Sequence, residues 1–347
     1  MSYPSVAVVI IHWNKRELLE QFLPSVIASS YPNLEIVLAD NASTDDSVEW
    51  VQRNYPNVKT LVLDQNYGYA GGYNHALKQV EAEYYILLNN DVEVTPNWIE
   101  PIISEMEKDA SIAAAQPKIL QYKNKEYFEY AGAAGGFMDH LGYIFCRGRI
   151  FESLEKDQGQ YDNNIPVFWA SGACLFIKSK AFHEVGGFDE EFFAHMEEVD
   201  LCWRLQLLGY HIWYIGQSKV YHLGGSTLKQ GNPQKTYLNF RNSLQMLLKN
   251  SSVSKLWWLI PVRSTLDLAG SIFFLLNAKP SHSWAVHRAH TDFFFKIKHW
   301  WHARDKITRN VEAEKVNGIY SSAVFFEHFV LGKKKFNSLS AKDKLLS

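Results

Sequence analysis

The sequence has few cysteines, no paired cysteine motif and no glycine-rich phosphate loop. Its three cysteines, Cys146, Cys174 and Cys202, lie far apart within 347 residues and form no CxxC pair. A secreted disulfide framework usually shows an even number of patterned cysteines, so this composition favours a reducing cytoplasm. Neither GxGxxG nor GxxxxGK[ST] occurs, which argues against a dinucleotide oxidoreductase and a P-loop enzyme. The phosphates of any nucleotide must be held in another way, such as by a metal ion.

The sequence also lacks a large net charge, because 35 Lys and Arg residues nearly balance 37 Asp and Glu residues. The balance conceals a division along the chain. Residues 1–248 carry 19 basic and 30 acidic residues, a net charge of −11, whereas residues 249–347 carry 16 and 7, a net charge of +9. The acidic first part argues against a nucleic-acid-binding protein. The basic second part is expected to contact an acidic ligand or a membrane.

Long uninterrupted hydrophobic runs are missing as well. The apolar residues 6–11 have no basic region ahead of them, so we interpret them as a buried strand and not as a signal peptide. The most apolar later stretch, residues 256–276, contains Arg263 and Asp267, and two charges argue against a membrane-spanning helix. With 47% hydrophobic and 14% aromatic residues, the chain has enough apolar material for a substantial core.

Short apolar runs alternate with helical patterns over the first 90 residues. The apolar runs cover residues 6–11, 35–39, 58–63 and 84–88, and the helical patterns cover residues 16–29, 44–54 and 71–81. This alternation predicts an α/β fold with a mostly parallel sheet and helices on both faces. In such folds, ligands bind beyond the carboxyl ends of the strands. Further helices are predicted over residues 197–208 and 233–249.

Acidic residues follow two of these predicted strands. At the end of the second strand, the Asp40 carboxylate can accept the imide N–H of uracil or thymine; the alternative is that Asp40 or Ser43 caps the next helix. At the end of the fourth strand, Asp91 suits a hard cation such as Mg²⁺ or Mn²⁺, which combines carboxylates with phosphate oxygens. The alternative there is an ordinary Asn/Asp turn. Each segment alone leaves both interpretations open.

Seven motifs in a fixed order carry a resemblance to a known family. They are Asp40 to Ser43, Asn66 to Asn74, Leu87 to Asp91, Trp169 to Leu175, Gly186 to Glu190, Glu197 to Arg204 and Tyr221 to Ser226. With them the sequence resembles the inverting family 2 glycosyltransferases of the GT-A fold, and most closely their bacterial rhamnosyltransferase-like branch. The resemblance implies a Rossmann-like, nucleotide-sugar-binding GT-A domain over residues 1–250 and a basic, aromatic-rich helical region over residues 251–347.

The resemblance also implies substrates and site residues. The donor would be a UDP- or dTDP-sugar, the acceptor a saccharide or lipid-linked glycan, and the setting cell-surface polysaccharide synthesis. The implied nucleotide-binding residues are Asp40, Asn14, Asn66, Gly72 and Asn90; the metal ligands for Mg²⁺ or Mn²⁺ are Asp91 and His222; the acceptor-binding residues are Trp169, Ser171, Gly172 and Asp200. Arg241 is a phosphate-contact candidate, because a guanidinium can hold phosphate in a bidentate manner; a surface ion pair is the alternative.

The acidic start of the predicted 197–208 helix would supply the catalytic base. Inversion requires a base that deprotonates the acceptor hydroxyl and a cation that neutralises the leaving diphosphate. By its position in the family motif, Glu198 is the base, although Asp is usual there and the extra methylene moves the carboxylate by about 1.5 Å. Glu197, about 100° away around the helix, is the second candidate. The substitution also leaves open a catalytically inactive nucleotide-sugar- or glycan-binding protein of the same fold.

Structural roles compete with several of these assignments. Asp200 and Arg204 lie four residues apart, so an intrahelical ion pair explains both residues. Core packing explains Trp169 as well as stacking on an acceptor sugar does. Residues 251–309 interleave tryptophan and phenylalanine with basic residues, which suits a helix lying among lipid headgroups. A helical subdomain packed on the catalytic domain is the alternative. We expect a cytoplasmic enzyme, peripheral at the inner face of the cytoplasmic membrane.

Overall fold

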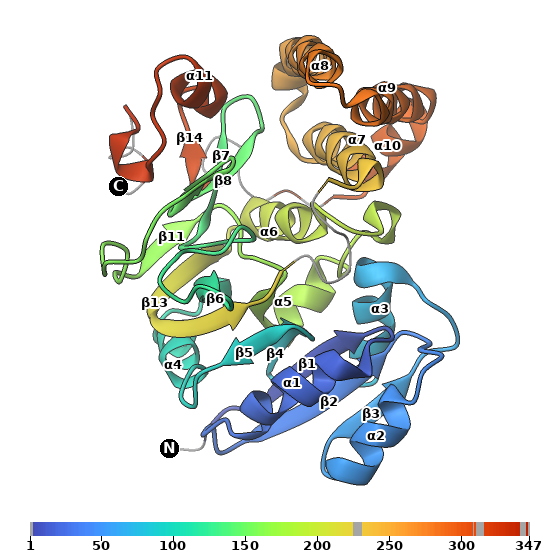
Figure 1. Ribbon diagram of the computed structural model, residues 1–347, viewed down its shortest axis with the longest axis vertical. Helices are drawn as coiled ribbons and strands as arrows, with labels where there is room; N and C mark the ends of the chain where they lie inside the picture. The colour runs from blue at the N-terminus through green and yellow to red at the C-terminus, as the bar shows by residue number, and fades with distance from the viewer. Residues whose placement is uncertain (1–2, 225–230, 308, 310–315, 341–344, 346–347) are drawn as a thin grey trace.

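The computed structural model describes residues 3–224, 231–307, 309, 316–340 and 345, so Gly225 and Ser226 of the last motif lie outside the described residues. Within this part of the chain, the main sheet has nine strands in the order β11-β13-β6-β12-β4-β1-β2-β3, with β5 paired to β13 (Figure 1). The bounds are β1 Val6–His12, β2 Leu34–Asp40, β3 Lys59–Val62, β4 Tyr84–Asn89, β5 Val92–Val94, β6 Ile112–Gln121, β11 Ile165–Val167, β12 Cys174–Lys178 and β13 His211–His222.

The predicted α/β fold is confirmed. Strand β1 pairs in parallel with β2 and β4, β2 with β3, and β6 with β13, whereas β12 runs antiparallel between β4 and β6. Successive β1 residues point to opposite faces: Ala7 and Val9 join one hydrophobic cluster, and Val6, Val8 and Ile10 join another. Both faces are therefore buried, which explains why β1 is a continuous apolar run.

Five of the helices in the first 250 residues lie close to the predicted ranges. The bounds of the helices in this part of the chain are α1 Arg16–Ile27, α2 Ser47–Asn54, α3 Gly68–Leu77, α4 Glu100–Lys108, α5 Ser179–Glu184, the 3-10 helix Glu190–Phe192, α6 Glu197–Leu207 and α7 Pro233–Asn250. The Asn232 side chain accepts a hydrogen bond from the Gln234 N–H and so caps α7. The sequence predicts a strand after Gly172 and another just before His222, which correspond to β12 and to the end of β13; strands β6 and β11 and helices α4 and α5 were not predicted.

A second, smaller sheet joins the middle of the chain to its C-terminal part. Within the described residues it contains β7 Gly136–Asp139, β8 Ile144–Cys146, β9 Arg149–Ile150, β10 Ser153–Leu154 and β14 Ile319–Tyr320. Strand β14 pairs in parallel with β7. The region after residue 250 is thus not purely helical, because its later part returns and completes a sheet that residues 136–154 begin.

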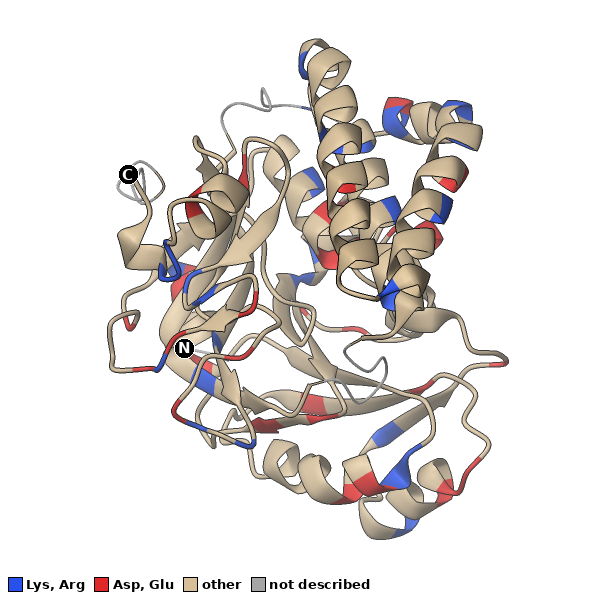
Figure 2. Cartoon of the chain, turned by 45° about the horizontal axis from the view of Figure 1, so that its top comes forward, with Lys and Arg blue, Asp and Glu red and all other residues tan. Residues whose placement is uncertain are grey.

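The other C-terminal elements are α8 Val253–Leu276, α9 Pro280–Phe295, α10 Ile297–Asp305 and α11 Val324–Phe329. Helices α7 to α10 stand together above the main sheet, and α11 lies beside β14 (Figure 1). Of the helices in the described ranges, α8 is the one long and apolar enough to cross a membrane. Acidic and basic residues occur on both parts of the molecule (Figure 2). The two parts therefore differ in net charge, although each contains residues of both signs.

Candidate active site

The strand register brings the predicted polar residues to one edge of the main sheet. His12 at the end of β1 lies opposite Asp40 at the end of β2, and Ile11 lies opposite Asn89 of β4. Cys174 of the antiparallel strand β12 lies opposite Leu88, so the residues just before Cys174 reach the same edge. The segments that contain Asp40, Asp91 and Gly172 are therefore neighbours, as the alternating strand and helix pattern predicts for the first two.

Asp40 closes a turn in the loop after β2. Its two carboxylate oxygens accept hydrogen bonds from the N–H and the hydroxyl of Ser43, at 2.9 and 2.5 Å, and its side chain is buried. Helix α2 begins later, at Ser47, where Asp45 bonds the N–H and hydroxyl of Ser47. The helix-capping interpretation of Asp40 and Ser43 is therefore wrong.

Asn14 joins the loop after β1 to the same turn. Its backbone N–H donates to the Ser43 hydroxyl at 2.8 Å, and its side-chain oxygen accepts from the Thr44 N–H at 2.8 Å. The backbone of Asn14 is left-handed, with φ 55°. These contacts hold the two loops that flank Asp40 in one arrangement.

Asn66 and Gly72 lie beside the Asp40 loop and shape it through Asn41. The Asn41 amide donates to the Asn66 side-chain oxygen at 3.1 Å and to the Gly68 carbonyl at 2.8 Å, while its oxygen accepts from the Tyr67 N–H at 2.9 Å. A Cβ atom at Gly72 would approach Ile11 to 2.3 Å. Gly72 therefore permits close packing of α3 on β1, and its contact with a nucleotide stays a prediction.

His12 is a site residue that the sequence analysis did not single out. Its buried imidazole contacts the Ser47 hydroxyl through Nε2 and the Asn90 amide through Nδ1, both at 2.9 Å. Burial lowers the pKa of His12, against the opposing effect of the Asp40 and Asp45 carboxylates. The available signal was a polar residue at the end of the first strand, next to the two predicted ligand-binding strands.

Asp91 and His222, which are the predicted metal ligands, lie next to each other. His222 Nε2 lies 3.1 Å from Asp91 Oδ1, and its Nδ1 lies 3.3 Å from Glu129 Oε2. All three side chains are buried. Burial lowers the pKa of His222, but the Asp91 and Glu129 carboxylates outweigh that effect and hold the pKa well above its ordinary value. Glu129, distant in sequence, was not predicted.

The donor set at this point fits a cation that is only partly held by protein. No group of three or more His, Cys, Asp or Glu side chains within the described ranges is arranged to hold a metal ion. One carboxylate and one imidazole are nevertheless sufficient for Mg²⁺ or Mn²⁺, which commonly take one or two protein ligands and complete their coordination with phosphate oxygens and water. Asp91 and His222 fit that pattern.

Glu197 and Glu198 begin α6, and each has a buried carboxylate oxygen without a hydrogen-bond partner among the described residues. Burial raises the pKa of Glu198 to about 7, although the Gly172 backbone opposes the rise. Burial and then the Glu198 carboxylate raise the pKa of Glu197 well above its ordinary value. The two carboxyl groups are therefore in a dry environment rather than on a solvated helix start, and Gly172 connects Glu198 to the sheet edge.

The chain enters α6 through an unusual backbone that α7 holds in place. Phe193, His195 and Met196 have left-handed φ angles of 62°, 71° and 73°, which are rare for such residues and typical of functional sites. The buried Asn242 amide donates to the carbonyls of Phe192, Ala194 and His195 at 3.0, 2.9 and 2.7 Å. Asn242 therefore fixes the direction in which Glu197 and Glu198 emerge.

Arg241 supports the same segment. Its guanidinium donates to the carbonyls of Glu191 and Phe192 at 2.8 and 3.2 Å and to the Asn242 side chain at 2.8 Å. Among the residues that the structure describes, Arg241 therefore forms no ion pair, and its guanidinium is instead bonded to backbone and amide oxygens. Contact with phosphate would require Arg241 to exchange these partners.

Three of the predicted acceptor-binding side chains are built into the interior. The Trp169 ring is buried and donates to the Phe137 carbonyl at 3.2 Å. The Ser171 hydroxyl donates to the Ala131 carbonyl at 2.7 Å. Asp200 accepts from Arg204 and Asn250, both at 2.7 Å, so the ion-pair interpretation of Asp200 and Arg204 is confirmed.

Gly172 differs, because it lies at the sheet edge under Tyr69. The Tyr69 hydroxyl donates to the Gly172 carbonyl at 2.6 Å, and a Cβ atom at Gly172 would lie 2.8 Å from that hydroxyl. A larger residue at position 172 would displace Tyr69. Of the four predicted acceptor-binding residues, Gly172 is thus the one placed beside the Glu198 carboxyl group.

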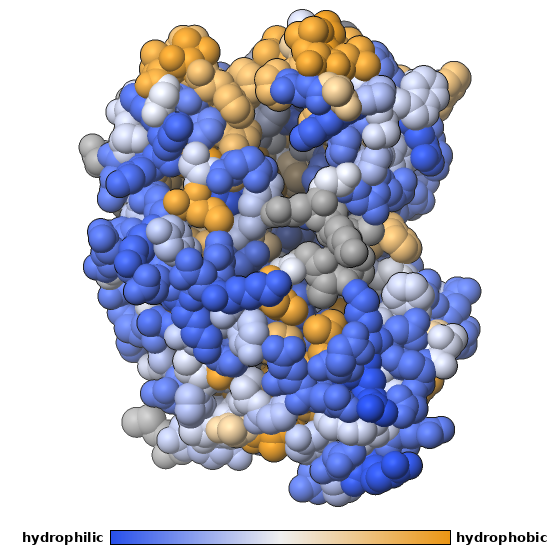
Figure 3. Space-filling view, in the orientation of Figure 1, coloured by the Kyte–Doolittle hydropathy of each residue, from blue (hydrophilic) through white to orange (hydrophobic). Residues whose placement is uncertain are grey.

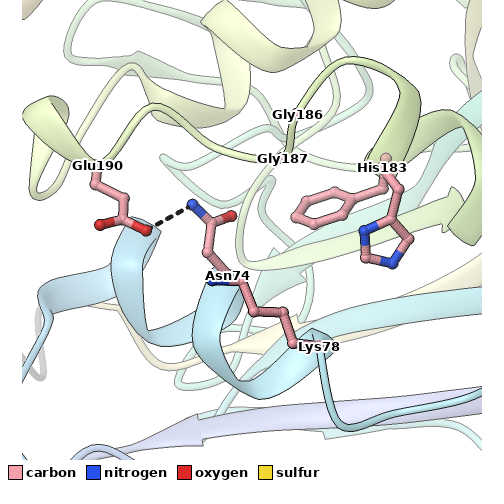
Figure 4. Close-up of a pocket in the computed structure, with 7 residues that line it drawn as sticks. Asn74, Lys78, His183, Gly186, Gly187 and Glu190 are labelled. Atoms are coloured by element: carbon pink, nitrogen blue, oxygen red, sulfur yellow. Dashed lines mark hydrogen bonds between the residues drawn. The ribbon is translucent and has the colours of Figure 1, made fainter.

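A small cavity of about 260 Å³ lies on another part of the surface, between α3 and the loop after α5 (Figure 4). Asn74, Lys78, His183 and Glu190 line it, and the Asn74 amide donates to Glu190 at 3.0 Å. Neither Asp40 nor Asp91 nor Glu198 lines this cavity. This cavity is therefore separate from the candidate active site at the sheet edge.

A mostly parallel sheet whose carboxyl end carries a carboxylate loop, an Asp–His pair and two glutamates at a helix start is the arrangement expected of a GT-A glycosyltransferase. The chain belongs to glycosyl transferase family 2, whose profile matches residues 7–186. It is 27% identical over 274 residues to N-acetylglucosaminyl-diphospho-decaprenol L-rhamnosyltransferase of Mycobacterium tuberculosis, which covers 75% of this chain and 88% of the relative. The match confirms the rhamnosyltransferase-like branch.

Other relatives and solved structures agree on the family and the fold. O-antigen biosynthesis protein RfbC of Myxococcus xanthus is 27% identical over 247 residues, which span 67% of this chain and 18% of that protein. GalNAc-T7, solved with UDP, GalNAc and Mn²⁺, superposes with a TM-score of 0.56 at 18% identity over 71% of this chain and 48% of that one. The mannosyltransferase PcManGT of Pyrobaculum calidifontis, solved with GDP-Man and Mn²⁺, gives 0.51 at 16% identity over 88% and 85%.

Proposed function

We propose that this enzyme transfers a sugar, with inversion, from a UDP- or dTDP-activated donor to a saccharide or lipid-linked glycan acceptor in cell-surface polysaccharide synthesis. The names of the mycobacterial and Myxococcus relatives support this setting, since one is a rhamnosyltransferase acting on a diphospho-decaprenol sugar and the other an O-antigen biosynthesis protein. Inversion, the pyrimidine nucleotide and the acceptor class belong to the proposal.

The observation that carries the mechanism is the carboxyl group of Glu198 at the sheet edge, one oxygen of which is buried without a hydrogen-bond partner among the described residues. An inverting transfer needs a base whose pKa lies near the working pH, so that it is ionised before the reaction and still able to take a proton. Burial raises the pKa of Glu198 to about 7. The carboxylate would accept the proton of the acceptor hydroxyl, while Asn242 holds the segment that aims it.

Asp91 and His222 would hold Mg²⁺ or Mn²⁺ in this proposal. The cation, when bound, would neutralise the charge that develops on the leaving nucleoside diphosphate. On the neighbouring strand, Asp40 would accept the imide N–H of the pyrimidine, and Asn14, Asn66 and Asn90 would keep the surrounding loops in register. The two Mn²⁺-containing structural relatives are consistent with such a site.

The proposed location is the cytoplasm, peripheral at the inner face of the membrane, with exposed aromatic residues of the 251–309 region at its surface. Trp257 and Trp284 are 81% and 70% exposed, and both belong to this region. Tryptophan side chains are favoured among lipid headgroups. A lipid-linked acceptor would be reached from that surface.

Glutamine substitutions at the two glutamates test the mechanism. We expect Glu198→Gln to lower the transfer rate by about 10²- to 10⁴-fold without weakening nucleotide binding, because it removes the base and keeps the shape. Glu197→Gln is the matched control and should retain most activity. The reverse result would assign the base to Glu197. Equal inactivity of wild type and both variants, with intact nucleotide binding, would instead support a non-catalytic sugar-nucleotide-binding protein.

A further inference from the structure

The C-terminal end of α8 exposes a continuous set of large apolar side chains. Phe273 is 62% exposed and Leu276 is 80% exposed, and Ile272 and Leu275 lie beside them with more than half of their surface exposed. We call these four residues the α8 patch. A set of this kind on a folded domain normally marks a contact with a partner or a membrane.

Helix α11 exposes a second set, which lies outside the region that the sequence analysis connected with a membrane. The exposed side chains are Phe325, Phe326, Phe329, Val330 and Leu331, which we call the α11 patch. Its most exposed member, Val330, has 63% of its surface accessible. Short apolar helices in proteins usually bury such residues, whereas α11 presents them to the outside.

Both patches lie at the same end of the molecule, where Figure 3 shows two hydrophobic areas above the positions of α11 and α8 in Figure 1. The β7–β8 hairpin fixes their spacing. Its Tyr143 ring packs 6.3 Å from the Phe325 ring of α11 and lies 3.9 Å below the Arg263 guanidinium of α8. Asp139 of the hairpin accepts from the Val324 N–H at the start of α11, at 3.0 Å. The two patches are therefore parts of one rigid surface.

The contacts made by the inner face of α8 indicate how that surface can bind a bilayer. Arg263 donates to the carbonyls of Leu141 and Gly142 at 3.2 and 3.0 Å, and Asp267 lies 3.3 Å from His290 of α9. Arg263 and Asp267 are both buried. These contacts attach α8 to the hairpin and to α9, and a helix that spanned the bilayer would lose them. The helix is long enough to span a membrane, but its contacts suit a helix that lies against one.

Exposed cations border both patches. Lys279 follows the end of α8, and Lys334 and Lys335 follow the α11 patch, all with exposed side chains. Lys333 is instead paired with Glu327 at 3.0 Å. Apolar side chains at the centre and lysines at the border match the acyl chains and the anionic headgroups of a phospholipid surface. A protein partner would not require this combination at two separate elements.

We propose that the α8 and α11 patches together bind an anionic phospholipid bilayer. We call this two-element binding surface the seat. The seat inserts from one side and does not span the membrane. The seat sets the height and orientation of the sheet edge relative to the lipid surface. The proposal rests on the proposed function only because a lipid-linked acceptor would lie at that surface. Because two attached elements bind more tightly than either one alone, loss of one element should release most of the protein.

Sedimentation of the full-length protein with vesicles tests the seat. The vesicles contain phosphatidylethanolamine and phosphatidylglycerol, with pure phosphatidylcholine for comparison. Two triple variants remove one patch each: Phe326→Ser, Val330→Ser and Leu331→Ser for α11, and Phe273→Ser, Leu275→Ser and Leu276→Ser for α8. We expect each to lower partitioning onto the anionic vesicles by at least about tenfold. The matched control, Val62→Ser, changes a residue that is 61% exposed on β3 and should have no effect.

A charge variant and a nucleotide-binding measurement complete the test. Lys334→Glu with Lys335→Glu should weaken binding to the anionic vesicles and leave binding to phosphatidylcholine unchanged. Wild-type protein that stays in the supernatant, or an α11 variant that binds as wild type does, would overturn the two-element seat. Binding of UDP or dTDP is measured in parallel without lipid. Intact nucleotide binding with no vesicle binding refutes the seat alone, whereas vesicle binding without nucleotide binding refutes the proposed function alone.

Discussion

Individual side chains at the sheet edge show what a strand-end pattern can reveal. The positions of Asp40 and Asp91 could be predicted, because an acidic residue that directly follows an apolar strand of a parallel sheet lies at the carboxyl end of that sheet. Glu129 and His12 could not be predicted, since their importance depends on which segments fold beside them. Trp169 looked suitable for a sugar but is a core residue, and no single-sequence pattern distinguishes those two uses of an aromatic side chain.

The role of Asp40 can be measured by nucleotide selectivity. Asp40→Ala should weaken binding of UDP or dTDP by about 10- to 100-fold, because a hydrogen bond to a charged group is lost. Binding of a purine diphosphate should not change. Ser43→Ala serves as the control, since it removes the turn partner and keeps the carboxylate. Equal weakening of pyrimidine and purine nucleotides would show that Asp40 acts only by shaping its loop.

The metal assignment predicts a loss of cation dependence. In Asp91→Ala, addition of Mn²⁺ should no longer strengthen UDP binding in calorimetric titration, because the carboxylate ligand is gone. Glu129→Gln, which alters the other neighbour of His222, should retain part of the Mn²⁺ effect. A full Mn²⁺ effect in Asp91→Ala would contradict the assignment.

The raised pKa of Glu198 predicts that activity increases and stability decreases as pH rises. The base must be ionised, so the transfer rate should rise as pH increases through about 7. The pKa of Glu198 is raised in the folded state, so its contribution to stability is fully present below pH 4.5 and is lost as pH rises through about 7. Glu198→Gln should therefore be more thermostable than wild type at pH 8 but not at pH 4, as scanning calorimetry can show. A wild-type activity profile that is flat between pH 6 and 8 would contradict this role.

At the scale of elements, prediction succeeded where the chain alternates regularly and failed where it does not. The first 90 residues form local strand–helix units whose spacing identifies them. Strands β6, β12 and β13 pair across long sequence separations, and β12 runs against its neighbours. Their partners are set by tertiary packing, which no local periodicity records. The same applies to the second sheet, whose short strands resemble loops in sequence.

Helix α7 has an element-scale role that Asn242 makes testable. Asn242→Ala would remove a buried donor shared by three carbonyls of the segment before α6, so we expect the free energy of unfolding to fall by about 1–3 kcal/mol. Because the same segment aims Glu198, kcat should fall more than KM rises. Gln234→Ala, at an exposed position of the same helix, is the control and should change neither. A loss of stability with unchanged kcat would limit Asn242 to a structural role.

At the scale of the whole molecule, the C-terminal part lies at the surface and also contributes side chains to the core. The Phe336 side chain is fully buried and packs against the rings of Phe137 and Phe145, at 5.2 and 6.3 Å between centroids. The charge division predicts that this part differs from the rest of the chain. It could not show that residues after 316 pack into the catalytic region, because that depends on the path of the chain.

This packing predicts a large effect at one remote residue. Phe336→Ala should destabilise the enzyme by about 3–5 kcal/mol, since it opens a cavity among aromatic rings in the second sheet region. Phe326→Ala, on the exposed side of α11, should cost less than about 1 kcal/mol. Chemical denaturation of the two variants measures the difference, and equal effects would show that the C-terminal segment does not contribute to the core.

The parallel pairing of β14 with β7 also has a consequence for biosynthesis. Met138 leaves the ribosome long before its strand partner Ile319, and helices α8 to α10 are made in between. The second sheet therefore cannot be completed until residue 320 has been translated, which makes its closure slow relative to the local strand–helix units. During that interval the exposed aromatic face of β7 and β8 needs shielding, so a nascent chain that stalls before residue 319 is expected to require chaperone assistance.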